Sequence, residues 1–127
     1  MKVLISGGSG LVGAALTESL RSEGHTVARL IRPDGAASAG DIRWDPASGF
    51  INVNAMEAAD AVVNLNGASI GGGRWTPERK KILRTSRVDS TRFLVGTLAR
   101  LDRKPRVFVS ASAIGYCGNR GDETLDE

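Results

Sequence analysis

The 127-residue sequence has the size and composition of one globular unit with a single hydrophobic core. Hydrophobic residues make up 41% of it, and its formal net charge is +3. The single cysteine, Cys117, excludes an intramolecular disulfide framework, and no apolar run is long enough to span a membrane. Basic and acidic residues are interleaved without an aromatic platform, so we expect no nucleic-acid partner. We expect a cytoplasmic protein without a secretory leader.

The apolar pattern predicts alternating strands and helices. We expect strands over 2–6, 26–31, 61–65 and 106–110, and helices over 11–23 and from 76 to about 101. Residues 42–44 and 50–52 are expected to form a hairpin or a strand and a return turn. The first helix is expected to bury Leu11, Ala15, Leu16 and Leu20, and the second Leu83, Val88, Val95, Leu98 and Leu101. This order is typical of an α/β fold with a doubly wound parallel sheet of the Rossmann type, whose ligand crevice follows the carboxyl ends of the strands.

Three glycines, Gly7, Gly10 and Gly13, join the first strand to the first helix. In such a loop one glycine permits a tight turn, one lets backbone N–H groups reach a pyrophosphate, and one lets the helix pack closely on the strand. The spacing is Gly-x-x-Gly-x-x-Gly, and an ordinary glycine-rich turn is the alternative. We expect the loop to bind a dinucleotide through Gly7, Ser9, Gly10, Leu11, Val12 and Gly13.

Arg32 ends the second predicted strand, where an acidic residue in NAD-binding proteins accepts hydrogen bonds from the ribose hydroxyls. An arginine there favours the 2′-phosphate of NADP, although a solvated loop arginine is the alternative. Asp41 and Asp45 could each approach the adenine amino group, but a turn is the commoner role for an aspartate before proline. The chain offers no pattern that predicts a metal site.

Four separated segments carry a family resemblance: the glycine loop, Asn64-Leu65-Asn66-Gly67, residues 87–94 of the second predicted helix, and residues 110–116. Together they resemble the extended and atypical short-chain dehydrogenase/reductases, most closely an epimerase-like branch. Trp44-Asp45-Pro46 and Arg74-Trp75-Thr76 look like marks of that branch. Proteins of this family are longer, so the resemblance implies that residues 1–127 are a dinucleotide-binding domain, truncated before a C-terminal substrate domain.

The resemblance also implies roles for individual residues. Leu65, Asn66 and Gly67 would line the adenosine and nicotinamide-ribose side of the cofactor, and Arg87, where the family often has Asn, would contact its phosphate or ribose. Ser112 matches the family's catalytic serine, with a turn or capping serine as an equal alternative, and Tyr116 matches a pocket-lining tyrosine. The family's Tyr-x-x-x-Lys pair would lie beyond residue 127.

These observations predict an NADP-dependent oxidoreductase or epimerase with a small-molecule substrate. A non-catalytic NADP-binding sensor or partner-binding protein is the alternative, since the epimerase-like branch often lacks the Tyr-x-x-x-Lys pair.

Overall fold

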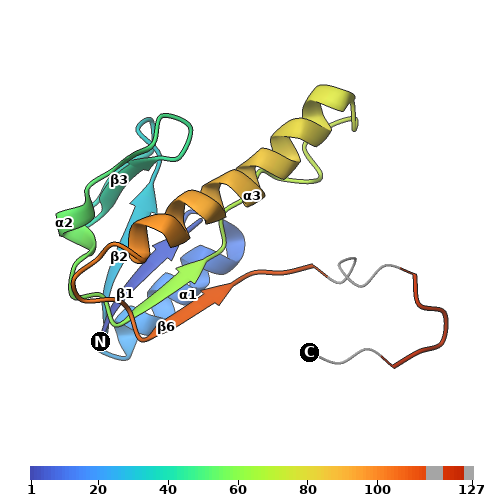
Figure 1. The fold of residues 1–127 in the computed structure, drawn as a ribbon. Coiled ribbons are helices and arrows are strands. Elements are labelled where there is room, and N and C mark those ends of the chain that lie inside the picture. The colour runs from blue at the N-terminus through green and yellow to red at the C-terminus, as the bar shows by residue number, and fades with distance from the viewer. Residues whose placement is uncertain (114–118, 125–127) are drawn as a thin grey trace.

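The computed structural model describes residues 1–113 and 119–124. Its centre is a six-stranded sheet in the order β4-β3-β2-β1-β5-β6 (Figure 1). The strands are β1 (Lys2–Ser6), β2 (Thr26–Ile31), β3 (Ile42–Asp45), β4 (Phe50–Ile51), β5 (Ala61–Asn64) and β6 (Val107–Ser110), and the helices are α1 (Leu11–Ser22), α2 (Val53–Met56) and α3 (Pro77–Leu98). All neighbouring strands run parallel except β4, which pairs antiparallel with β3. The predicted α/β fold with a parallel sheet is confirmed.

The two faces of the sheet bury separate apolar clusters because successive residues of a strand point to opposite faces. In β1, Leu4 joins a large cluster with Leu94 and Leu98 of α3. Val3 and Ile5 join a smaller cluster, against which the partly buried Leu16 and Leu20 of α1 pack. The helices α1 and α3 therefore cover opposite faces of one sheet (Figure 1).

Polar side chains meet where the three strands β1, β5 and β6 end. Ser6, Asn64 and Ser110 are partners in the parallel register. The Ser6 hydroxyl donates to Asn64 Oδ1 at 2.5 Å, and Asn64 Nδ2 donates to Ser110 Oγ at 3.2 Å and to Thr91 Oγ1 of α3 at 2.9 Å. These bonds satisfy the buried Asn64 side chain, whose desolvation would otherwise be unfavourable, and they join three strand ends to one helix.

The buried face of α1 differs from the predicted one. Leu11 is 92% exposed and Ala15 is exposed, whereas Gly13 and Thr17 are the buried residues of the helix. Gly13 packs directly on the Gly7 backbone, and the Thr17 hydroxyl donates to the Gly13 carbonyl oxygen at 2.7 Å. This close approach rotates the small residues toward the sheet, so the strongest apolar residue of the first turn points away.

The buried face of α3 is also corrected. Val88 and Val95 are 40% and 45% exposed, while Leu94 is fully buried. Two small polar residues of the helix, Ser90 and Thr97, are buried as well, and each hydroxyl donates to a backbone carbonyl one turn earlier. Hydroxyl groups that bond their own helix fit an apolar interface, so hydropathy alone misplaced this face.

Smaller differences concern element ends. The helix predicted to about residue 101 ends at Leu98, and a short helix, α2, was not predicted, although Asn52 caps it by accepting a hydrogen bond from the N–H of Ala55. None of the helices among residues 1–113 is long and apolar enough to cross a membrane. Tyr116 and Cys117 lie outside the described residues.

We predict that Gly13→Ala lowers the free energy of unfolding by about 1–3 kcal/mol, since a Cβ there would lie 2.7 Å from Gly8 Cα and against the Gly7 carbonyl. Gly10→Ala is the matched control, because its Cβ would meet only the Gly7 oxygen, at 3.4 Å. Urea denaturation of both variants measures the difference. Equal stability of the two would contradict the packing role of Gly13.

Candidate functional site

The glycine loop between β1 and α1 lies beside the end of β5. Gly7 has a φ of 74°, which favours glycine, and a Cβ at this position would lie 2.5 Å from the carbonyl oxygen of Leu65. The N–H of Leu65 in turn donates to the Ser6 carbonyl at 3.0 Å. The tight turn predicted for Gly7 is therefore confirmed, and it brings the loop against the segment that begins with Leu65 and Asn66.

The N-terminus of α1 opens onto this loop. Gly10 is the N-cap residue, and no side chain caps the helix and no acidic residue lies in its first turn. Because the first backbone N–H groups of a helix lack intrahelical acceptors, those of Leu11, Val12 and Gly13 are available to an anion. Ser9, Gly10, Leu11 and Val12 are exposed here, whereas Gly13 is buried, so four of the predicted loop residues form an accessible surface.

Two cavities adjoin at the carboxyl ends of the strands. The larger, of about 610 Å³, lies between the β3–β4 turn, the segment after β5 and α3. The smaller, of about 380 Å³, lies between the glycine loop and the segment that follows β2. Arg32 and Asn66 line both cavities. Gly7 and Ser9 line the smaller one and Gly67 the larger, so the structure brings the predicted residues of three separate segments together.

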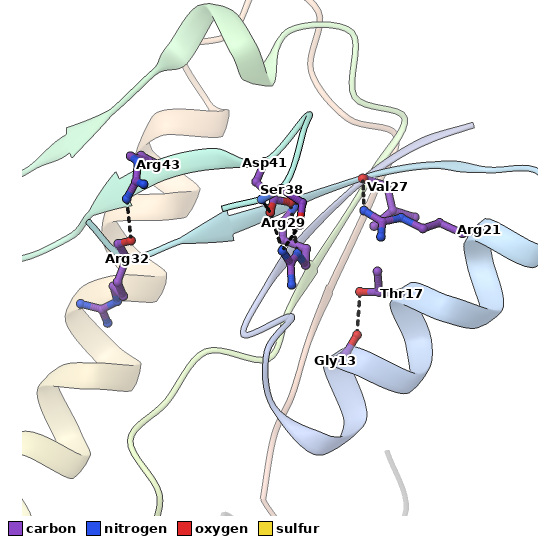
Figure 2. A network of polar contacts seen from close by, with 9 residues as sticks. All are labelled: Gly13, Thr17, Arg21, Val27, Arg29, Arg32, Ser38, Asp41 and Arg43. Atoms are coloured by element: carbon purple, nitrogen blue, oxygen red, sulfur yellow. Dashed lines mark hydrogen bonds and ion pairs between the residues drawn. The ribbon is translucent and has the colours of Figure 1, made fainter. Parts of the chain in front are cut away.

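Arg32 is held in place at both its backbone and its side chain. Its guanidinium carbon lies 5.7 Å from the ring centroid of Trp44, a cation–π distance, and Trp44 is buried and stacked on Phe93. Its carbonyl oxygen accepts hydrogen bonds from the N–H of Gly35 at 2.9 Å and from Arg43 Nη1 at 3.5 Å (Figure 2). The cation thus stands at the border of the two cavities in a defined position.

The segment after β5 is anchored to α3 by serines that the sequence analysis missed. Asn66 Nδ2 donates to Ser90 Oγ at 2.8 Å and to the Ser86 carbonyl at 3.0 Å. The Ser86 hydroxyl accepts from the N–H of Ala68 at 2.9 Å. Ser86 and Ser90 lie one turn apart on one helix face and line the larger cavity, and this spacing is the only local signal that could have found them.

Arg87 lies behind this segment and does not line either cavity. Its Nη2 donates to the Ala68 carbonyl at 3.0 Å, and its Nη1 donates to the Leu83 carbonyl at 3.1 Å. Its guanidinium packs on Gly67, where a Cβ would lie 2.9 Å from Arg87 Cζ. In this arrangement Arg87 supports the backbone of the cavity wall.

Asp41 does not offer its carboxylate to either cavity, which corrects its possible role beside an adenine. The carboxylate is fully buried against Arg29 of β2, with Oδ2 2.5 Å from Nη2 and Oδ1 3.1 Å from Nε (Figure 2). The sequence analysis missed this ion pair, although an arginine inside an apolar strand is a signal that a partner is needed. Asp45 has the predicted turn role, since its Oδ1 accepts from the N–H of Ala47 at 3.1 Å.

Ser112 follows β6 and is exposed. The N–H of Ala111, the residue before Ser112, donates to the Asn64 carbonyl at 2.9 Å and so continues the β5–β6 ladder. Ser112 is thus placed at the same edge of the sheet as the glycine loop and Asn66.

Comparison with protein families identifies the NAD dependent epimerase/dehydratase family, whose model matches residues 3–126. Among curated relatives, an epimerase family protein of Mycobacterium leprae is 41% identical over 125 residues, covering 98% of this chain and 40% of that protein. The chain thus spans about 40% of the length of the first relatives it matches.

Solved structures of the family have the same fold. The human epimerase family protein SDR39U1, crystallised with NADPH, is 32% identical with a TM-score of 0.75, over 91% of this chain and 38% of that one. A nucleoside-diphosphate sugar epimerase of Corynebacterium glutamicum is 35% identical with a TM-score of 0.76, over 98% of this chain and 25% of that one. The described fold is therefore that of NAD(P)-binding epimerases and short-chain dehydrogenase/reductases.

The Arg29–Asp41 pair predicts a pH dependence of stability. Burial by itself raises the pKa of Asp41, but hydrogen bonds from the Arg29 side chain and from the N–H groups of Ser38 and Arg29 outweigh it, so the pKa lies below its ordinary value. A carboxyl with a lowered folded-state pKa stabilises the fold above its unfolded pKa of about 3.9, and this contribution is lost as pH falls through the folded value.

We therefore expect Asp41→Asn to be less stable than the wild type by a constant amount between pH 5 and 8, on the order of 1.5–3 kcal/mol for lost charged hydrogen bonds. The difference should shrink as pH falls below about 4. Urea denaturation across pH measures it. A difference that does not change between pH 7 and 3 would contradict the role of the ionised carboxylate.

Proposed function

Since the chain belongs to the NAD-dependent epimerase/dehydratase family, we propose that it binds NADP(H) and forms the cofactor-binding part of an oxidoreductase or epimerase with a small-molecule substrate. The observation that carries the proposal is the juxtaposition of an uncapped α1 N-terminus with two cavities that share Arg32 and Asn66. The NADPH bound to human SDR39U1 supports the same choice of cofactor.

The pyrophosphate of the cofactor is proposed to lie over Gly10. A Cβ at this residue would meet only one atom within 4 Å, so the space above the backbone is open, whereas Gly7 and Gly13 are closed by their own packing. The N–H groups of the first helical turn and the positive end of the helix dipole favour an anion at this place. The residues present therefore fit a pyrophosphate.

The adenosine half is proposed to occupy the two cavities. Arg32 would pair with the 2′-phosphate, because its guanidinium stands between them and no acidic residue ends β2 to repel that group. Asn66 and Gly67, with Leu65 before them, would line the adenosine side as far as the nicotinamide ribose. Arg87 would act on this site through the backbone that it supports.

A bound nicotinamide supplies hydride transfer. On this chain, Ser112 is proposed to hold the substrate oxygen by its hydroxyl group, since it follows β6 at the carboxyl edge of the sheet. That edge also carries the cofactor loop, so a substrate oxygen and the cofactor would meet there.

The test of the proposal is calorimetric titration of the full-length protein with NADPH. Gly10→Val should abolish binding, because its side chain fills the approach to the backbone N–H groups, while circular dichroism shows a retained fold. The wild type should bind. Wild-type protein that binds neither NADPH nor NADH, or a Gly10→Val protein that binds as the wild type does, would overturn the proposed site.

Cofactor selectivity is expected to depend on Arg32. Arg32→Asp should weaken the binding of NADPH by about 10- to 100-fold more than the binding of NADH, because it removes a charge-assisted contact worth roughly 1.5–3 kcal/mol. Arg100→Asp makes the same charge change at an exposed position beyond α3 and should leave both affinities unchanged. Equal weakening of NADPH and NADH by Arg32→Asp would show that this side chain does not contact the 2′-phosphate.

A further inference from the structure

The ion pair joins Arg29 of β2 to Asp41, the residue before β3, across a segment of nine residues, 32–40, that is neither helix nor strand. The Asp41 carboxylate accepts from the backbone N–H, Nε and Nη2 of Arg29 and from the N–H of Ser38, at distances of 2.5 to 3.1 Å. Arg29 Nη2 also donates to the Ser38 hydroxyl at 3.3 Å. The pair therefore closes the segment at its base (Figure 2).

A buried ion pair contributes little net free energy to the stability of a strand. The Asp41 side chain is fully buried and that of Arg29 is 19% exposed. Desolvation of two charges offsets most of their attraction, and apolar residues of similar volume often stabilise a protein equally well. Fixing one arrangement among several is the best-attested use of buried ion pairs. Arg29 of this pair lies between two walls of the smaller cavity.

One wall of this cavity is the glycine loop. Arg29 lies beneath Gly8, where a Cβ would lie 2.9 Å from Arg29 Cγ and 3.0 Å from Cδ. The same side chain lines the smaller cavity together with Ser9 of the glycine loop. The other wall of that cavity is the closed segment, which contributes Arg32 to Ala36 except Pro33. One arginine thus sets the distance between the loop and the segment.

Charge separates the role of Arg29 from that of Arg32. The charged residues that line the smaller cavity are Arg29, Arg32 and Asp34. Arg29 is neutralised by Asp41, whose hydrogen bond also raises the pKa of its guanidinium, so it stays ionised and paired. Arg32 has no such carboxylate partner among the described ion pairs; its backbone belongs to the segment, and its guanidinium stacks on Trp44.

We propose that the Arg29–Asp41 pair is the positioning element for cofactor selectivity, because it holds segment 32–40 against the glycine loop so that Arg32 meets a 2′-phosphate. This inference rests on the proposed NADP(H) binding. The pair itself does not touch the phosphate in this role. Loss of the pair weakens binding of the 2′-phosphate, because that contact depends on segment 32–40. It has less effect on binding of the pyrophosphate, which depends on the α1 N-terminus.

The test measures dissociation constants of NADPH and NADH for the full-length protein. Arg29→Met keeps an apolar stem under Gly8 and removes the ion pair, and Asp41→Asn removes the charge at the other end. Both variants should lower the selectivity for NADPH over NADH by about five- to tenfold, with NADH affinity nearly unchanged. Arg29→Lys retains a cation near Asp41 and should restore part of the selectivity lost in Arg29→Met.

Arg92→Met is the matched control. It breaks an ion pair with Asp89 on the surface of α3, where the two side chains are 76% and 59% exposed, and should leave the selectivity of the wild type. If the Arg29 and Asp41 variants weaken both cofactors equally, or leave the selectivity unchanged, the pair is only structural and the inference is wrong. A wild type that binds neither cofactor would instead overturn the proposed function itself, and the inference with it.

Discussion

The contact of three backbone segments at Gly7 is the constraint on which the rest of the structure depends. The Leu65 carbonyl lies where a Cβ of Gly7 would be, and the Gly7 carbonyl lies where a Cβ of Gly13 would be. Only glycine at both positions allows β1, β5 and α1 to approach so closely. This approach sets the direction in which α1 points, and therefore where its uncapped N–H groups lie relative to the cavities.

Satisfied polar groups then fix the carboxyl edge of the sheet. Asn64 of β5 bonds to side chains of β1, β6 and α3, and Asn66, two residues later, bonds to Ser86 and Ser90 of the same helix. Burying either side-chain amide without hydrogen-bond partners would destabilise the fold. Because these bonds link β1, β5 and β6 to α3, the strand ends and the helix keep one arrangement, which sets the cavity walls that they form.

Several arginine side chains make hydrogen bonds or ion pairs within the chain. Arg29 is paired with Asp41, Arg43 donates to the Pro33 carbonyl, and Arg87 donates to the Ala68 carbonyl. Their guanidinium groups are therefore fixed by contacts within the protein. Arg32 lines both cavities and its guanidinium stacks on Trp44, so this arginine remains the candidate for contact with an anion.

The sequence by itself determined the features that depend on neighbours along the chain. The glycine loop, the turn at Asp45, and the helix start at Thr76, whose hydroxyl caps α3, follow from backbone freedom and local hydrogen bonds, and the apolar strands follow from their composition. Only the tertiary structure decided which helix faces are buried and where charges find partners. Val95 and Leu94 look alike in sequence, and Asp41 has its partner twelve residues away. Burial and ion pairing depend on surfaces brought together by folding, and no local pattern records them.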